Sequence, residues 1–165
     1  MQAIHKFPGI PRTQRGASLI EVLIAVLIMG IGLLGIAAMQ TTALRNSQSS
    51  LERSQAVIQS YTIFEAMRSN RADALGGAYN TAGWICAAPT GTSHAARDSI
   101  AWINSMKETM GVAGDTTTCG NIACVAATGI CTVGIQWDDS RAVDAGASGV
   151  QAGLSTRQVQ TVTRL

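Results

Sequence analysis

Residues 15–40 of this 165-residue chain decide its fold, and they read RGASLIEVLIAVLIMGIGLLGIAAMQ. Between 22 and 39 no side chain is charged or strongly polar. As a helix with a rise of ~1.5 Å per residue, that segment would be roughly 27 Å long, close to the hydrocarbon thickness of a bilayer. A chain of this size offers no second group of apolar helices to surround it. We therefore predict a membrane-inserted helix rather than a buried core helix.

The segment in front of the apolar run is basic and contains no acid, with Lys6, Arg12 and Arg15 among residues 1–16. A basic segment before an apolar one also describes a secretory signal peptide. The run is longer than the usual signal core of about 7–15 residues, no clear small-x-small cleavage site follows it, and the next residues continue as a helix. The positive-inside rule then keeps the basic front in the cytoplasm and sends the remainder across the membrane.

One carboxylate, Glu21, interrupts the beginning of the run. An acid among apolar residues is costly in lipid unless it is paired. Either Glu21 reaches the headgroups, or another molecule in the membrane supplies the opposite charge. Gly30, Gly32 and Gly35 also allow two interpretations: small residues for helix contact in lipid, or a segment that can extend during assembly.

Residues 15–40 resemble the class III signal of type IV prepilins and pseudopilins. Gly16 corresponds to the last leader residue, Ala17 to the first mature residue and Glu21 to the fifth. The resemblance implies that a prepilin peptidase cleaves between Gly16 and Ala17 and methylates the new amine of Ala17. It also implies that Glu21 pairs with the N-terminal amine of a neighbouring subunit during assembly. Ala17 stands where most members of the family carry phenylalanine.

The resemblance implies an α+β, pilin-like fold, in which a long N-terminal helix packs against a small C-terminal antiparallel sheet. We expect a leader at 1–16, a transmembrane or filament-core helix at 17–39, an amphipathic continuation at 40–75 and a globular head at 76–165. The whole helix is predicted to run from 17 to about 71. Its second half carries an apolar stripe at helical spacing, expected to face the head; the stripe consists of Leu44, Leu51, Val57, Ile58, Tyr61 and Phe64.

In the head we predict a short helix at 97–110 and strands at 116–119, 122–126, 130–137 and 158–165, with loops at 76–96 and 142–155. Trp84 and Ile85 are expected to anchor the first loop. The alternation in 130–137 predicts a core face made of Cys131, Val133, Ile135 and Trp137. Asp138 and Asp139 are interpreted as a solvated turn rather than a metal site.

Four cysteines lie in the predicted head, at 86, 119, 124 and 131. An even number in an exported domain favours two disulfides, with three possible connectivities. Zinc is the rival interpretation, but the spacing lacks a paired C-x₂-C. We predict Cys119–Cys124, which would close a short loop, and Cys86–Cys131, which would tie the loop after the long helix to the central strand.

Composition excludes several classes of function. Hydrophobic residues make up 47% of the chain, charged residues 13% and aromatic residues 4%, which is unlike a disordered chain. The formal charge of +2 becomes −1 without residues 1–16, since 9 basic residues then remain beside 10 acidic ones. No basic patch favours nucleic acid. His94 beside Ser93 has no acidic partner in the pattern, so we expect no enzyme, no cofactor and no metal.

Within the family, the resemblance is greatest to minor pilins of type IV pili. It implies several partners: the prepilin peptidase, other minor pilins, the major pilin and an inner-membrane assembly platform. It also implies a single-pass protein of the inner membrane, with its head in the periplasm, that later joins the pilus at the cell surface. Its effects would be on pilus assembly, twitching motility and adhesion. Two alternatives stay open: a minor pseudopilin of a type II secretion system, and a single-span membrane-anchored binding domain.

Overall fold

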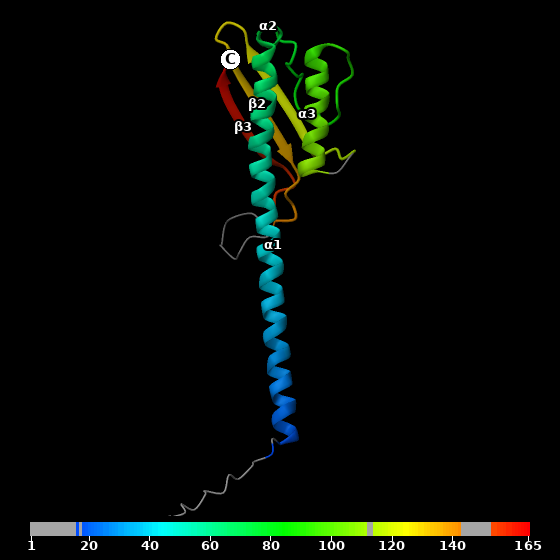
Figure 1. The fold of residues 1–165 in the computed structure, drawn as a ribbon, viewed down its shortest axis with the longest axis vertical. Coiled ribbons are helices and arrows are strands. Elements are labelled where there is room, and N and C mark those ends of the chain that lie inside the picture. Colours follow the sequence, from blue (N-terminus) through cyan, green and yellow to red (C-terminus); the bar gives the residue numbers. More distant parts are fainter. Residues whose placement is uncertain (1–15, 17, 112–113, 143–152) are drawn as a thin grey trace, which may run out of the picture. The chain divides into compact units, whose positions relative to one another are not determined.

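The computed structural model of the chain describes residues 16, 18–111, 114–142 and 153–165 (Figure 1). It separates into two compact units, Met1–Gln40 and Thr41–Leu165, which we describe individually. The elements, in chain order, are α1 (Leu19–Ser69), α2 (Arg71–Leu75), α3 (His94–Met110), β1 (Cys119–Val125), β2 (Ile130–Trp137) and β3 (Arg157–Arg164).

In the first unit, α1 begins directly after Ser18, whose carbonyl oxygen accepts the N–H groups of Glu21 and Val22. The large apolar side chains that follow are 49% to 77% exposed, the extremes being Ile36 and Leu19. Among the described residues, α1 is the helix that is long and apolar enough to cross a membrane. A helix that is apolar on all sides and unburied fits a lipid environment.

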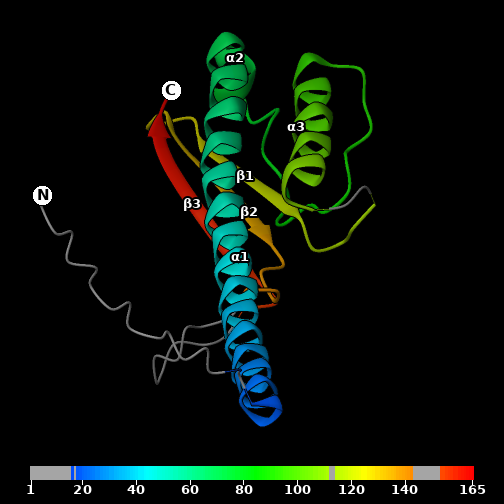
Figure 2. The same cartoon turned by 60° about the horizontal axis from the view of Figure 1, so that its bottom comes forward.

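The second unit is built on a three-stranded antiparallel sheet in the order β1-β2-β3. Strand β2 has the bounds predicted for it, the two short strands predicted before it form the single strand β1, and β3 lies one residue earlier than predicted. The C-terminal part of α1 and the helix α3 lie side by side over one face of the sheet (Figure 2). The predicted α+β architecture, a long N-terminal helix packed with a small antiparallel sheet, is confirmed.

The core lies between the two helices and the sheet. The predicted core face of β2 is confirmed, because all four of its residues are at most 1% exposed. Helix α3 starts three residues before the predicted position because the Ser93 hydroxyl accepts the N–H of Ala96 and caps the helix. The largest core side chains are Ile63, Phe64, Met67, Tyr79, Trp102, Ile103, Met106, Ile122, Ile135 and Trp137.

The predicted apolar stripe on α1 is wrong. Of its residues only Phe64 is buried, and the other five are 38% to 71% exposed. The helix instead buries a face that includes Ala56 and Ser60, whose small side chains let the sheet approach closely. Gln59 on this face donates from Nε2 to the Ser105 hydroxyl at 2.7 Å, whereas its Oε1 is buried without a hydrogen-bond partner among the described residues. The buried face therefore combines the apolar residues Ile63, Phe64 and Met67 with polar residues that the rest of the head contacts.

The segment after α2 is anchored as predicted. Ile85 forms an isolated antiparallel bridge with Gly120, and the Trp84 ring packs over Gly134 on β2, where a Cβ atom would lie 2.8 Å from the ring. The sequence predicts one helix that ends near residue 71. In the structure, α1 ends at Ser69 and a separate short helix, α2, follows it. Of the predicted loop at 142–155, residues 143–152 lie outside the described residues.

Candidate functional site

The predicted processing site lies at the start of α1. Gly16 and Ser18 are exposed and outside any helix, and α1 begins at Leu19. Ala17, the predicted first mature residue, lies outside the described residues. Gly16 is therefore exposed and precedes the regular helix.

The predicted assembly residue, Glu21, lies exposed in the first turn of α1. A negative charge there is favoured by the partial positive charge at the helix N-terminus. Within the part of the chain that the structure describes, its carboxylate has no hydrogen-bond or ion-pair partner.

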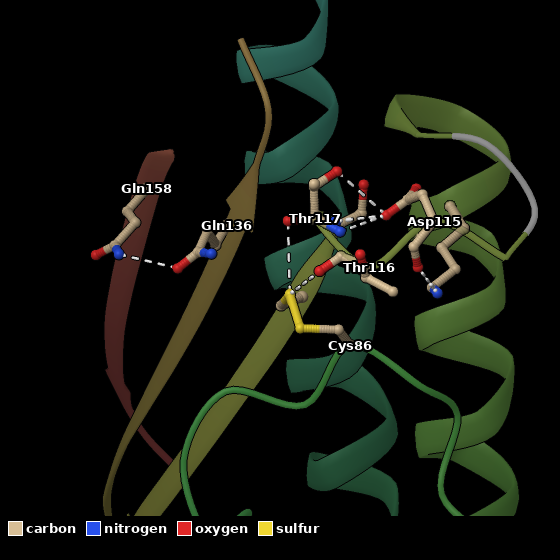
Figure 3. Close-up of a disulfide and its surroundings, with 9 residues drawn as sticks. Cys86, Asp115, Thr116, Thr117, Gln136 and Gln158 are labelled. Carbon is tan, nitrogen blue, oxygen red and sulfur yellow. Dashed lines mark hydrogen bonds between the residues drawn. A yellow bond between two sulfur atoms is a disulfide. The ribbon is translucent and has the colours of Figure 1, made fainter. Parts of the chain in front are cut away.

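The four cysteines form two disulfides, as predicted, but the predicted pairing is wrong. The bonds are Cys86–Cys119, shown in Figure 3, and Cys124–Cys131. All four cysteines are used, which leaves none for zinc. The predicted Cys119–Cys124 bond is excluded by geometry. Both residues lie in β1, five positions and therefore ~17 Å apart, whereas a disulfide needs Cα atoms within about 7 Å.

Strand register explains the observed pairing. The β1–β2 hairpin places Cys124 directly opposite Cys131. The bridge between Ile85 and Gly120 likewise brings the next residue, Cys86, beside Cys119. A sequence signal for the first bond existed, since Cys124 and Cys131 lie symmetrically about the turn at 126–129. The second bond depends on which residues of the 78–86 segment pair with the edge of β1, and no local sequence pattern encodes that position.

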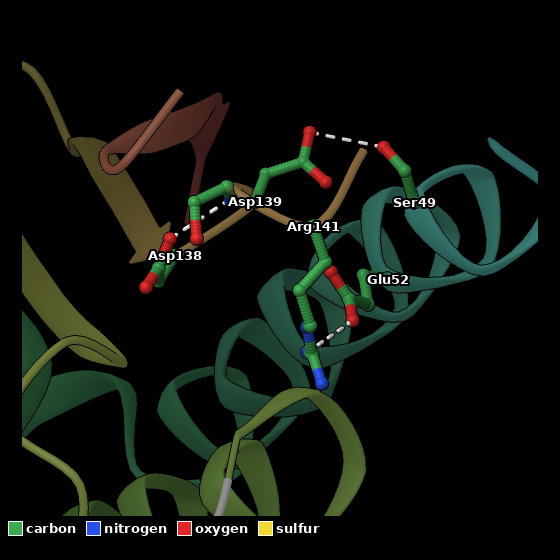
Figure 4. A network of polar contacts seen from close by, with 6 residues as sticks. Ser49, Glu52, Asp138, Asp139 and Arg141 are labelled. Atoms are coloured by element: carbon green, nitrogen blue, oxygen red, sulfur yellow. Dashed lines mark hydrogen bonds and ion pairs between the residues drawn. The ribbon is translucent and has the colours of Figure 1, made fainter. Parts of the chain in front are cut away.

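The predicted solvated turn at 138–139 is wrong for one of its two residues. Asp139 is only 2% exposed, and its Oδ2 accepts hydrogen bonds from the Ser49 hydroxyl at 2.9 Å and from Arg157 Nε at 3.1 Å. Asp138 is half-buried and accepts the backbone N–H of Ser140 (Figure 4). Asp139 therefore connects α1, the end of β2 and the start of β3. Among the described residues there is no group of three or more potential metal ligands.

A second buried acid, Glu52, was not singled out by the sequence. It lies on α1 and is 6% exposed, and its Oε1 accepts a hydrogen bond from Arg141 Nη2 at 2.9 Å (Figure 4). Burial raises the pKa of Glu52 above its ordinary value of 4.5; Arg141 opposes this shift, and the negative charge of Asp139 adds to it. No periodicity marks this residue, because an isolated glutamate on a polar helix segment usually faces solvent.

Tyr79, which follows α2, is buried and donates its hydroxyl proton to Asp98 Oδ2 of α3 at 2.5 Å. Burial, together with this hydrogen bond, raises the pKa of Tyr79 to about 12. The pair fastens the segment after α2 to α3. Its role is structural, since it holds two elements of the core together.

The Ser93–His94 pair has no catalytic arrangement. The Ser93 hydroxyl accepts the Ala96 N–H as the helix cap, and the His94 ring lies 3.5 Å from the Arg97 guanidinium. A hollow of about 250 Å³ between α1 and α3 is lined by Gln59, Asp98, Trp102 and five other residues. In the described ranges, no nucleophile faces a base within hydrogen-bonding distance there.

Comparison with known proteins identifies the N-terminal region. Residues 11–37 match the prokaryotic N-terminal methylation motif, and the match includes Gly16, Ala17 and Glu21. No curated protein and no solved structure matches the chain. The motif implies processing by a prepilin peptidase and assembly with pilins in a membrane system. Together with the apolar helix and the small antiparallel sheet, it supports a type IV pilin-like protein of a pilus or pseudopilus.

Proposed function

We propose that this protein is a minor pilin of a type IV pilus, with a structural rather than enzymatic role. The methylation motif at 11–37 carries the proposal. Beyond the motif, residues 44–74 and 132–139 resemble the type IV pilus modification protein PilV. These two stretches are joined in the fold, because Ser49 of the first donates a hydrogen bond to Asp139 of the second. The resemblance therefore covers two stretches, one in the helical part and one in the sheet, that contact each other in the fold.

In the proposed pathway, the prepilin peptidase cleaves after Gly16 on the cytoplasmic side of the inner membrane and methylates Ala17. The chain remains anchored by the apolar part of α1, with its head in the periplasm. On the assembly platform, Glu21 pairs with the N-terminal amine of a neighbouring pilin, so that two groups that are costly in a dry environment compensate each other. The protein then joins other minor pilins and the major pilin, and it supports pilus assembly, twitching motility and adhesion.

The mature N-terminus is the direct test of processing. We expect mass spectrometry of the membrane-extracted protein to show a chain that begins at Ala17 with a methylated amine. A Gly16→Val variant is expected to keep the leader. A wild-type chain that retains Gly16 contradicts the proposal and favours a membrane-anchored binding domain.

A deletion strain distinguishes the pilus from a secretion system. Loss of surface pili and twitching, restored by the wild-type chain and accompanied by normal protein secretion, supports the minor pilin. Loss of type II secretion with normal piliation contradicts it and favours a minor pseudopilin. Sheared pili, probed with an antibody against the head, should contain the protein in small amounts relative to the major pilin.

A further inference from the structure

The two edge strands of the sheet, β1 and β3, differ in whether their outward-pointing backbone groups are hydrogen-bonded. At the β1 edge, the backbone groups that point away from β2 belong to Gly120, Ile122 and Cys124, and all six of them are bonded. Gly120 exchanges two hydrogen bonds with Ile85, at 2.8 and 2.9 Å. The remaining four groups are bonded by two residues, since Thr81 serves Ile122 through its N–H and hydroxyl, and the Asn80 amide serves both groups of Cys124.

The strand register identifies the corresponding groups at the β3 edge. In an antiparallel pair, successive residues direct their N–H and C=O groups alternately to the two sides. Because residues 120, 122 and 124 point outward, their neighbours in β1 bond the even-numbered residues of β2, and the odd-numbered residues of β2 bond β3. Their partners in β3 are 157, 159, 161 and 163, which leaves Gln158, Gln160, Val162 and Arg164 with backbone groups directed away from the sheet.

Within the described ranges, none of the eight backbone groups on this edge has a hydrogen-bond partner. Natural edges are commonly protected by proline, by a bulge, by a short strand or by charged side chains. Strand β3, RQVQTVTR, has no proline and pairs with β2 over eight residues in unbroken register, and its charged residues lie only at its two ends, which leaves 158–163 uncharged. A regular open edge of this length can add a strand from another chain.

The charge around the edge indicates what such a strand would carry. β3 contains no acidic residue and ends at Arg164. Beside that end, Arg68 Nη2 lies 3.5 Å from the Thr163 hydroxyl, and Arg71 Nη2 donates to the Leu165 carbonyl oxygen at 3.1 Å. Of these arginines, only Arg68 has an ion-pair partner among the described residues, the exposed Glu65. A second copy of this chain would bring another acid-free strand, so charge complementarity favours an acidic partner.

We propose that the open edge of β3 binds an extended segment of a partner protein, by backbone pairing with Gln158, Gln160, Val162 and Arg164, and that this segment carries acidic side chains that face the arginines at 68, 71 and 164. Backbone bonds supply the affinity of such an added strand, and charge selects among strands. This surface does not depend on the assembly role: a chain that binds an acidic strand but never enters pili would contradict only the role in the pilus.

The first test measures hydrogen exchange by NMR on the mature full chain in detergent micelles. The amides of Gln158, Gln160 and Val162 are expected to exchange rapidly, and those of Gly120, Ile122 and Cys124 to be protected. Protection of the β3 edge amides in the free chain at low concentration overturns the proposal, because the edge is then already covered by the chain itself. Protection that appears only at high concentration identifies a second copy as the occupant and also overturns it.

The second test uses a synthetic strand as the probe. An eight-residue peptide of alternating threonine and valine with glutamate at both ends is titrated into the labelled chain. We expect slower exchange at the β3 edge and affinity about tenfold higher than that of the same peptide with lysine ends. The glutamate peptide with N-methylated alternate amides cannot pair and should not bind. Equal binding of all three peptides, or no binding by the first, overturns the proposal.

Variants of the chain separate backbone pairing from charge. Val162→Pro removes an N–H group that points away from the sheet but no hydrogen bond to β2. We expect it to lower the affinity for the glutamate peptide about tenfold. Arg164→Glu should lower the same affinity about threefold. Arg97→Glu, at an exposed position of α3, is the matched control and should leave the affinity unchanged. Protection of the Val133 amide in β2 reports that each variant is folded. Unchanged binding by folded Val162→Pro contradicts the proposal.

Discussion

The Ser49 hydroxyl of α1 donates a hydrogen bond to Asp139 Oδ2 at 2.9 Å, although the two residues lie 90 positions apart in the chain. The same oxygen accepts from Arg157 Nε at the start of β3. One buried carboxylate thus connects the helix with two strands. Beside it, the buried Glu52 accepts a hydrogen bond from the exposed Arg141, so polar contacts contribute to the packing of this region (Figure 4).

Removing this carboxylate should destabilise the head. We expect Asp139→Ala to lower the free energy of unfolding by about 2–3 kcal/mol, since hydrogen bonds from Ser49 and Arg157 to a buried charged group are lost. The measurement is denaturant unfolding of the mature chain in detergent micelles. Asp138→Ala is the matched control and should cost under about 1 kcal/mol, because among the described residues Asp138 accepts a hydrogen bond only from the local Ser140 N–H. Equal effects of the two variants would contradict the role assigned to Asp139.

Glu52 should make stability depend on pH. Because its folded-state pKa is raised above 4.5, the folded state binds more protons than the unfolded state in the window between the two values, and stability falls as pH rises through that window. The Glu52→Gln variant has no carboxyl group to ionise at this position, so its stability does not fall in this way. Its free energy of unfolding relative to wild type should therefore increase from pH 4.5 upward and then level off. Unfolding measured from pH 4 to 8 tests this. Glu65→Gln, an exposed acid on the same helix, should show little change, and a parallel response in both variants would refute the assignment.

Tyr79 should contribute stability that is lost in alkali. Its pKa is raised from 10.0 to about 12, so the contribution is fully present below pH 10 and disappears as pH rises through about 12. We expect Tyr79→Phe to cost about 1.5–3 kcal/mol at neutral pH, since a hydrogen bond to the Asp98 carboxylate is lost. The deficit should shrink between pH 10 and 12. Tyr61→Phe, at an exposed position of α1, is the control and should change stability little at either pH.

The two disulfides should differ in their effect on stability. The Cys86–Cys119 bond spans 33 residues and the Cys124–Cys131 bond only 7, across a hairpin that already pairs. Chain-entropy estimates give about 4 kcal/mol for the longer loop and about 2–3 kcal/mol for the shorter one. Replacing each pair by alanine and measuring unfolding tests this order. Peptide mapping without reduction should recover only these two pairs, and a Cys86–Cys131 peptide would overturn the described pairing.

Glu21 should matter for assembly and not for cleavage. We expect Glu21→Ala or Glu21→Val to be processed normally, because the cut lies after Gly16, but to be reduced in sheared pili, because the neighbouring amine loses its counter-charge. Quantitative immunoblots of membrane and pilus fractions measure both. Glu65→Ala, at an exposed position in the C-terminal part of α1, is the control and should enter pili normally. Normal incorporation of both Glu21 variants would exclude the proposed pairing.

Several features of the molecule were readable from local patterns. The uncharged run at 22–39 indicated a membrane helix, and the alternation in 130–137 identified strand β2 and its buried face. The Gly16–Ala17–Glu21 spacing indicated the signal that the methylation motif also matches. Each of these depends on residues within one element, whose period or spacing is set by the geometry of a single helix or strand.

Other features depend on tertiary contacts between elements that are distant in the sequence. The cysteine pairing follows the register of β1 against β2 and the position of Ile85 beside Gly120. The buried face of α1 centres on Ile63, Phe64 and Met67 and includes Glu52 and Gln59, which Arg141 and Ser105 hydrogen-bond from positions 46 or more residues away. Asp139 is likewise buried, with hydrogen bonds from Ser49 and Arg157. Polar groups can be buried when tertiary structure satisfies them, and no period within one segment contains that information.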